Sequence, residues 1–136
     1  MTKILAENLF NRPLIVMNIG NRRWETYRSF TYSVGGLDTG DHITVPKGFQ
    51  TDFASVPRVF WRILPPDGQY TQAAVLHDHL YNKQDRSRKE CDDIFFEAMG
   101  VLKVDEWKRV LMYHAVRKFG WLPWGNKRKR IVNATR

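Results

Sequence analysis

The sequence predicts an α+β fold in which a small N-terminal antiparallel β-sheet precedes three to four α-helices. Three observations favour this order. Residues 22–36 (RRWETYRSFTYSVGG) alternate aromatic and β-branched side chains with polar ones, as a half-buried strand does. Glycine pairs and the turn sequence DTGD separate the apolar runs of the first half. In the second half, apolar side chains recur at helical spacing between capping and stop signals.

Two further strands are expected beside this alternating segment. The apolar run 12–20 (RPLIVMNIG) ends at Gly20, and because Asn21 follows, we expect a hairpin there. The short run 42–49 (HITVPKGF) carries Pro46 near its end, which is typical of a sheet edge, since proline donates no ladder hydrogen bond.

Proline, glycine and capping residues divide the helical half. A first helix begins at Pro57 and stops before Pro65, and the next covers DGQYTQAAVLHDHLYNK. The third has Asp85 or Ser87 as its N-cap and Gly100 as its stop.

A last helix is expected to begin near Asp105 and to end at Gly120. We expect its buried stripe to consist of Trp107, Val110, Leu111, His114 and either Lys118 or Phe119. A lone histidine on such a stripe is more often a packed core residue than a catalyst.

Composition indicates one domain, which we assign to residues 1–125, followed by a basic tail over 126–136. The lone Cys91 excludes an internal disulfide. No apolar run approaches the roughly 20 residues that span a bilayer. We expect no signal peptide, because Glu7 and Asn8 interrupt the N-terminal segment, and we therefore expect the protein in the host cytoplasm.

The excess positive charge lies in the last quarter of the chain. Residues 103–136 contain ten Lys or Arg and two acidic residues, so they account for the whole net charge of +8. The tail residues Lys127, Arg128, Lys129 and Arg130 are candidates for binding nucleic acid, an anionic membrane or an acidic protein surface. The alternative is a solvated tail. Pro123 and Gly125 indicate a turn or docking segment before it.

The stretch AVLHDHLYNKQ places titratable side chains in an apolar run. Helical spacing puts His77 and Tyr81 on one face with Asp78 beside them, whereas His79 points away. The two histidines therefore cannot ligate one metal together. His77 is a candidate catalytic base, or else a core histidine satisfied by a hydrogen bond.

Asp92 in CDDIFFEAM is the candidate partner of His77. The linker between the two helices is short, so they should pack as an antiparallel hairpin and bring Asp92 near the imidazole. A carboxylate that holds one ring nitrogen leaves the other as a general base. Alternatively, Asp92 and Asp93 stabilise the helix dipole from its first turns.

The segment PKGFQTDFASVPR joins a strand to a helix. Ser55 is a candidate helix N-cap, and Thr51 and Arg58 are candidate supporting residues. Asp52 lies between two phenylalanines on a segment that should be partly buried, so it needs a cationic partner or a metal.

Four stretches (GFQTDFASVPRVFW, AAVLHDHLY, CDDIFFEAM and AVRKFG) resemble the pattern of an uncharacterised family of small bacteriophage and prophage proteins, a domain of unknown function. The resemblance covers roughly residues 45–120. It implies a phage origin, with incorporation in a virion as one location, and it supplies no mechanism.

A weaker likeness is to phospholipase A2, whose His-Asp-x-x-Tyr helix is similar to His77, Asp78 and Tyr81. That likeness implies that His77 deprotonates water, Asp78 binds calcium and Asp92 orients His77. The glycine-rich calcium loop and the disulfides of the secreted enzymes are absent, so Asp52 would have to complete a calcium or zinc site.

Three functions remain open at this point. The first is a small phage hydrolase acting on peptidoglycan or phospholipid, with His77 and Asp92 catalytic and Asp52 and Asp78 holding a divalent metal. The second is a non-catalytic virion or tail component that contacts other subunits. The third is a nucleic-acid-binding protein that uses the basic tail.

Overall fold

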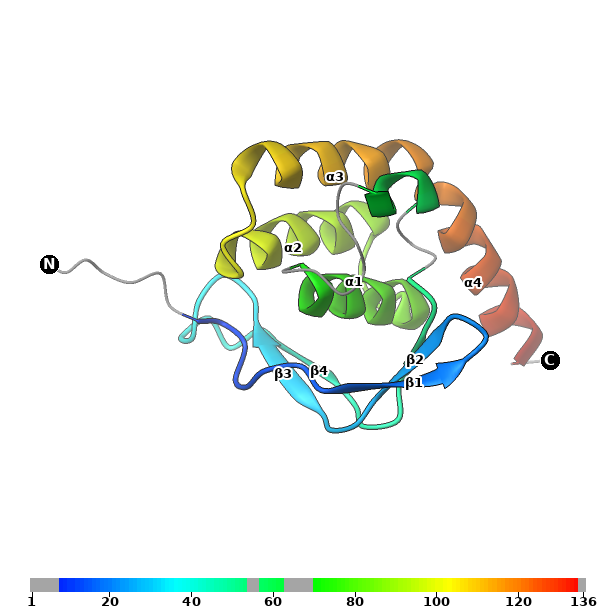
Figure 1. The fold of residues 1–136 in the computed structure, drawn as a ribbon, viewed down its shortest axis with the longest axis horizontal. Helices are drawn as coiled ribbons and strands as arrows, with labels where there is room; N and C mark the ends of the chain where they lie inside the picture. Colours follow the sequence, from blue (N-terminus) through cyan, green and yellow to red (C-terminus); the bar gives the residue numbers. More distant parts are fainter. Residues whose placement is uncertain (1–7, 54–56, 63–69, 135–136) are drawn as a thin grey trace, which may run out of the picture.

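The computed structural model describes residues 8–53, 57–62 and 70–134, apart from the side chain of Trp61, and confirms the α+β class. Five strands come first and four α-helices follow (Figure 1). The strands are β1 (Val16–Gly20), β2 (Arg23–Thr26), β3 (Phe30–Ser33), β4 (His42–Val45) and β5 (Gln50–Thr51). After a 3₁₀ helix, η1 (Arg58–Arg62), come α1 (Thr71–Lys83), α2 (Arg88–Val101), α3 (Glu106–Phe119) and α4 (Trp121–Ala134).

The strands form two small antiparallel sheets. One has the order β1-β2-β5, and the other pairs β3 with β4. The expected hairpin after Gly20 is present, and its two turn residues Asn21 and Arg22 have φ of 54° and 59°. Positive φ at both central residues is typical of a type I′ turn, whose twist matches that of the paired strands. β4 ends at Val45, directly before Pro46, as expected of an edge.

The alternating segment 22–36 is not one strand, as the pattern suggested, but two in different sheets. The chain turns between β2 and β3, where Arg12 donates from Nε to the Ser29 carbonyl (2.7 Å) and from Nη2 to its hydroxyl (2.9 Å). Alternating polar and apolar residues indicate a strand. They do not show where the chain leaves one sheet and enters another.

The helices pack in sequence on one side of the strands (Figure 1). α1 contacts α2, α2 contacts α3, and α4 returns to α1. Ser87 is the N-cap of α2, where it forms a capping box with Glu90. Gly100 lies inside α2 rather than at its stop, and the left-handed residue after the helix is Lys103, with φ of 63°.

The predicted buried stripe of α3 is wrong. Met112, Ala115 and Val116 are its buried residues, whereas Trp107 is 59% exposed and His114 is also exposed. The predicted stripe places the large Trp107 side chain inside. Instead, the buried side chains of α3 are smaller than the Trp107 ring, and this face packs against α2.

The segment after Gly120 is helical, where the sequence indicates a turn or docking segment before a basic tail. Residues from Trp121 to Ala134 form α4. Pro123 lies in the first turn, where its missing N–H has no helical partner to lose. No helix of the described residues is long and apolar enough to cross a membrane.

Candidate active site

His77 and Asp92 lie together in the core, as the sequence predicts. Nε2 of His77 is 2.7 Å from Oδ1 of Asp92, and neither side chain has exposed surface. The imidazole stacks on Phe95 (centroids 4.5 Å apart) and contacts the Tyr81 ring at 4.3 Å. Because a carboxylate only accepts hydrogen bonds, the imidazole carries a proton on Nε2 in this contact.

Asp92 accepts hydrogen bonds from three helices. The Tyr81 hydroxyl of α1 donates to Oδ1 at 2.7 Å. Arg117 of α3 donates to Oδ2 at 2.8 Å, and Arg88 of α2 lies 3.4 Å from the same oxygen. Burial raises the pKa of Asp92, but the bonds from His77, Tyr81 and Arg117 outweigh it, so the pKa lies below its ordinary value. Asp92 is therefore a carboxylate at neutral pH.

Local sequence explains how these groups meet. His77 and Tyr81 are four residues apart on α1, and Arg88 and Asp92 are four apart on α2. Arg88 also donates to the Val116 and Arg117 carbonyls at 2.8 and 3.0 Å, which satisfies the C-terminal end of α3.

Gly120 makes this close approach feasible. A Cβ on Gly120 would lie 2.5 Å from the Tyr81 hydroxyl and 2.9 Å from Nη1 of Arg88, besides contacting the Val116 carbonyl. Its φ is −68°, so the glycine is required for space and not for a left-handed backbone.

Asp78 does not face the same partners as His77. Its Oδ1 accepts from Nζ of Lys127 on α4 at 2.8 Å, and the two side chains are 1% and 7% exposed. The sequence predicts Lys127 in a basic tail that binds an anionic partner or is solvated. Instead it is the buried counter-ion of a carboxylate, because the curve of the chain after Gly120 lays α4 along α1.

The proposed metal ligands do not form a visible cation site. Asp78 already has an ammonium at hydrogen-bond distance, and Asp52 is exposed beyond β5 rather than partly buried as expected. Within 8–53, 57–62 and 70–134, no group of three or more His, Cys, Asp or Glu side chains is arranged to hold a metal. A divalent ion at Asp78 would have to displace Lys127, so we derive no reaction step through a metal.

The remaining candidates are separate from the His77–Asp92 pair. Thr51 is buried, and its hydroxyl accepts from the Phe53 backbone N–H at 3.1 Å. Arg58 is exposed on η1, and Ser55 lies outside the described residues. On α4, Arg128, Lys129 and Arg130 are exposed, unlike Lys127.

Sequence reasoning did not find Arg88, Arg117 or Gly120. Arg88 was detectable, because it is four residues before Asp92 on one helix and a buried carboxylate needs a cation. Arg117 and Gly120 belong to the motif AVRKFG, which had been noted only as part of a resemblance.

Comparison with known proteins agrees with that resemblance in part. The family described as "Protein of unknown function (DUF1353)" matches residues 24–116. The "Uncharacterized protein y4jT" of Sinorhizobium fredii is 36% identical over 78 residues, which is 56% of this chain and 23% of that protein. The matched region thus spans about a quarter of this relative's length. No solved structure matches the chain.

Proposed function

The chain belongs to the DUF1353 family of unknown function, and for this member we propose a small phage hydrolase in which His77 is the general base. One observation carries the proposal. A carboxylate that is itself held by Tyr81 and Arg117 accepts from one nitrogen of an imidazole at 2.7 Å. Such a pair fixes the ring and its tautomer, which a general base requires.

The proposed reaction is hydrolysis of an ester or amide of the cell envelope. Nδ1 of His77 takes a proton from water, and the hydroxide adds to the carbonyl carbon. The imidazolium then returns the proton to the departing oxygen or nitrogen. Asp92 stabilises the imidazolium through the Nε2–H bond, while Tyr81 and Arg117 position Asp92. The candidate substrates are phospholipid and peptidoglycan.

Burial of His77 sets a condition on this reaction. The ring has no exposed surface, so water and substrate reach it only when the surrounding packing opens. The assays should therefore include the native form of each substrate, namely phospholipid vesicles and intact peptidoglycan sacculi. We place the protein in the host cytoplasm or in the assembled virion.

The test compares wild type with His77→Asn and Asp92→Asn, with His114→Asn as the matched control on the exposed face of α3. Loss of a general base lowers the rate by about 10²- to 10⁴-fold. We expect that loss in His77→Asn and wild-type activity in the control. Activity of His77→Asn equal to wild type, or no hydrolysis of either substrate by folded wild type, would reject the proposal.

The second candidate is a non-catalytic virion or tail component. It is favoured by the complete burial of the His77 and Asp92 side chains. Asp92 joins α1, α2 and α3 through four donors, as a network that only fixes the fold also does. This candidate predicts that the protein is found by mass spectrometry in purified virions and that His77→Asn lowers stability without changing any activity. Its absence from virions counts against it.

The exposed cations of α4 leave nucleic acid as a third candidate partner. Replacing Arg128, Lys129 and Arg130 together by Gln removes three charges and leaves the buried Lys127 pair intact. If these residues bind phosphates, affinity for duplex DNA falls and its dependence on salt becomes weaker. Unchanged binding in this variant removes the basis for that candidate.

A further inference from the structure

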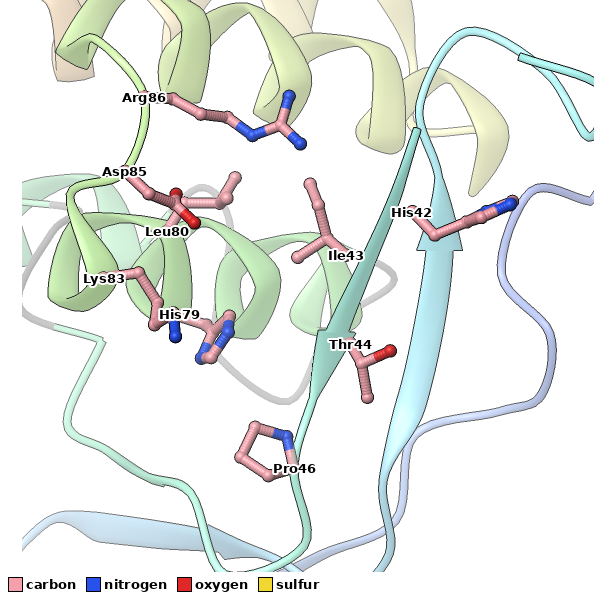
Figure 2. A pocket seen from close by; sticks show the side chains of 9 residues that line it. All are labelled: His42, Ile43, Thr44, Pro46, His79, Leu80, Lys83, Asp85 and Arg86. Atoms are coloured by element: carbon pink, nitrogen blue, oxygen red, sulfur yellow. The ribbon is translucent and has the colours of Figure 1, made fainter. Parts of the chain in front are cut away.

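A pocket of about 490 Å³ lies between β4 and α1. Figure 2 shows His79 and Lys83 of α1 facing Pro46 and Ile43 of the strand side, while His42 and Thr44 point to the other side of β4. This volume is within the range of small-molecule sites. Buried Ile43 and Leu80 give it an apolar floor.

Among the described residues, His79 has an aromatic neighbour but no hydrogen-bond partner at this pocket. Its side chain is only 8% exposed, and its contact is the edge-to-face packing on Phe49, with centroids 5.2 Å apart. Within the described part of the chain neither ring nitrogen has a hydrogen bond, and neither is a fully buried atom without a partner, so the ring keeps contact with solvent at the pocket. Burial, with Lys83 adding to it, holds the pKa of His79 below its ordinary value, against Asp85 and Asp78. The imidazole is thus neutral and offers one donor and one acceptor.

The rim of the pocket carries charges of both signs. Lys83 and Asp85 are exposed, and neither forms an ion pair among residues 8–53, 57–62 and 70–134. Arg86 is different, because both of its terminal nitrogens donate to Asp41, at 2.9 and 2.5 Å. The charges available to a ligand are therefore one ammonium and one carboxylate beside the imidazole.

We propose that this pocket binds a small ligand that carries both an amino group and an anionic group, a phosphate or a carboxylate, next to a short apolar part. The anionic group pairs with Lys83, the amino group pairs with Asp85, and His79 donates to the ligand. The apolar part covers Ile43 and Leu80. This site is distinct from the His77–Asp92 pair and does not depend on the proposed hydrolase activity.

The test follows the ring signals of His79 by nuclear magnetic resonance in the full chain. O-Phosphoethanolamine and diaminopimelate present both charges, whereas inorganic phosphate and ethanolamine present one each. We expect the two-charge probes to shift the His79 signals at concentrations about tenfold lower than the single-charge probes. Binding of O-phosphoethanolamine assigns the anion as phosphate, and binding of diaminopimelate assigns it as carboxylate.

Lys83→Gln and Asp85→Asn test the role of each charge, and Lys129→Gln on α4 is the matched control. Each pocket variant should weaken binding about tenfold, as expected for loss of one charge-assisted hydrogen bond. The control should bind as wild type does. The proposal is overturned if no probe shifts His79 at millimolar concentration, if phosphate alone binds as well as O-phosphoethanolamine, or if Lys83→Gln binds as wild type does.

Discussion

The two histidines of α1 are two residues apart and have opposite surroundings. His77 faces Asp92 and Phe95 of α2, and these side chains and Tyr81 of α1 surround a ring with no exposed surface. His79 faces β4, where it has no hydrogen-bond partner within the described residues and lines an open pocket. A helix rotates by about 200° over two residues, so one short motif supplies both faces. The contrast is between a buried imidazole that is hydrogen-bonded to a carboxylate and an imidazole that lines a pocket without a hydrogen bond within the described residues.

The largest expected loss of stability comes from removing the carboxylate that bonds His77. Asp92→Ala leaves Arg117, His77 and the Tyr81 hydroxyl without their acceptor in the core. Removing one partner from a buried charge network costs about 3–5 kcal/mol of unfolding free energy. Urea denaturation followed by circular dichroism measures it.

Asp93→Ala is the matched control for that experiment. Asp93 is the next residue, but it is exposed and bonded to Lys89 and Tyr113. Its loss should cost no more than about 1 kcal/mol. Equal losses for the two variants would show that the Asp92 network does not stabilise the fold.

Lys127→Met tests the other carboxylate of the motif and should have the next largest effect. It leaves Asp78 buried without a counter-ion, which costs about 3 kcal/mol in a denaturant titration. The double variant Lys127→Met with Asp78→Leu should recover part of that loss, and Lys129→Met at an exposed position should change little. No recovery in the double variant contradicts the pairing.

Gly120→Ala tests how tightly the residues around His77 and Asp92 are packed against the end of α3. The added methyl group meets the Tyr81 hydroxyl and Arg88, so we expect a loss of about 1–3 kcal/mol. At Gly125 of α4 nothing lies within 4 Å of the added Cβ. Gly125→Ala should therefore stabilise the helix by about 0.5–1 kcal/mol. Thermal melting of both variants checks the opposite signs.

The smallest effect is the pH dependence that comes from His79. The pKa of His79 is lowered in the folded state, so below its ordinary value near 6.5 the unfolded chain binds more protons. This contribution to stability is fully present above that pH and is lost as the pH falls through the folded-state pKa. His79→Gln should make the fall in stability between neutral and mildly acidic pH less steep. An unchanged slope shows that burial does not shift the pKa of His79.

The sequence predicts the fold class, the main helices and the His77–Asp92 contact, because each rests on local periodicity or on a short connection. It does not predict which face of α3 is buried. That choice depends on the fit to α2 and not on the size of Trp107. Nor does it predict that Lys127 pairs with Asp78, since the two are 49 residues apart and meet only after α4 returns to α1.

The pocket beside His79 was also outside the reach of sequence reasoning. Its walls come from β4 and from α1 with the residues that follow it, and nothing local indicates that these segments lie side by side. The sequence does indicate that His79 faces away from His77. The structure shows that His79 faces β4.

The most direct test of the central claim is a long-range proton–nitrogen correlation spectrum of the histidine rings at neutral pH. We predict that His77 is a single tautomer with its proton on Nε2, that this proton exchanges slowly with water, and that Asp92→Asn abolishes both properties. His79 should show faster exchange. A His77 ring with mixed tautomers, or a ring that exchanges as fast as His79, would contradict an imidazole held by Asp92 in the core.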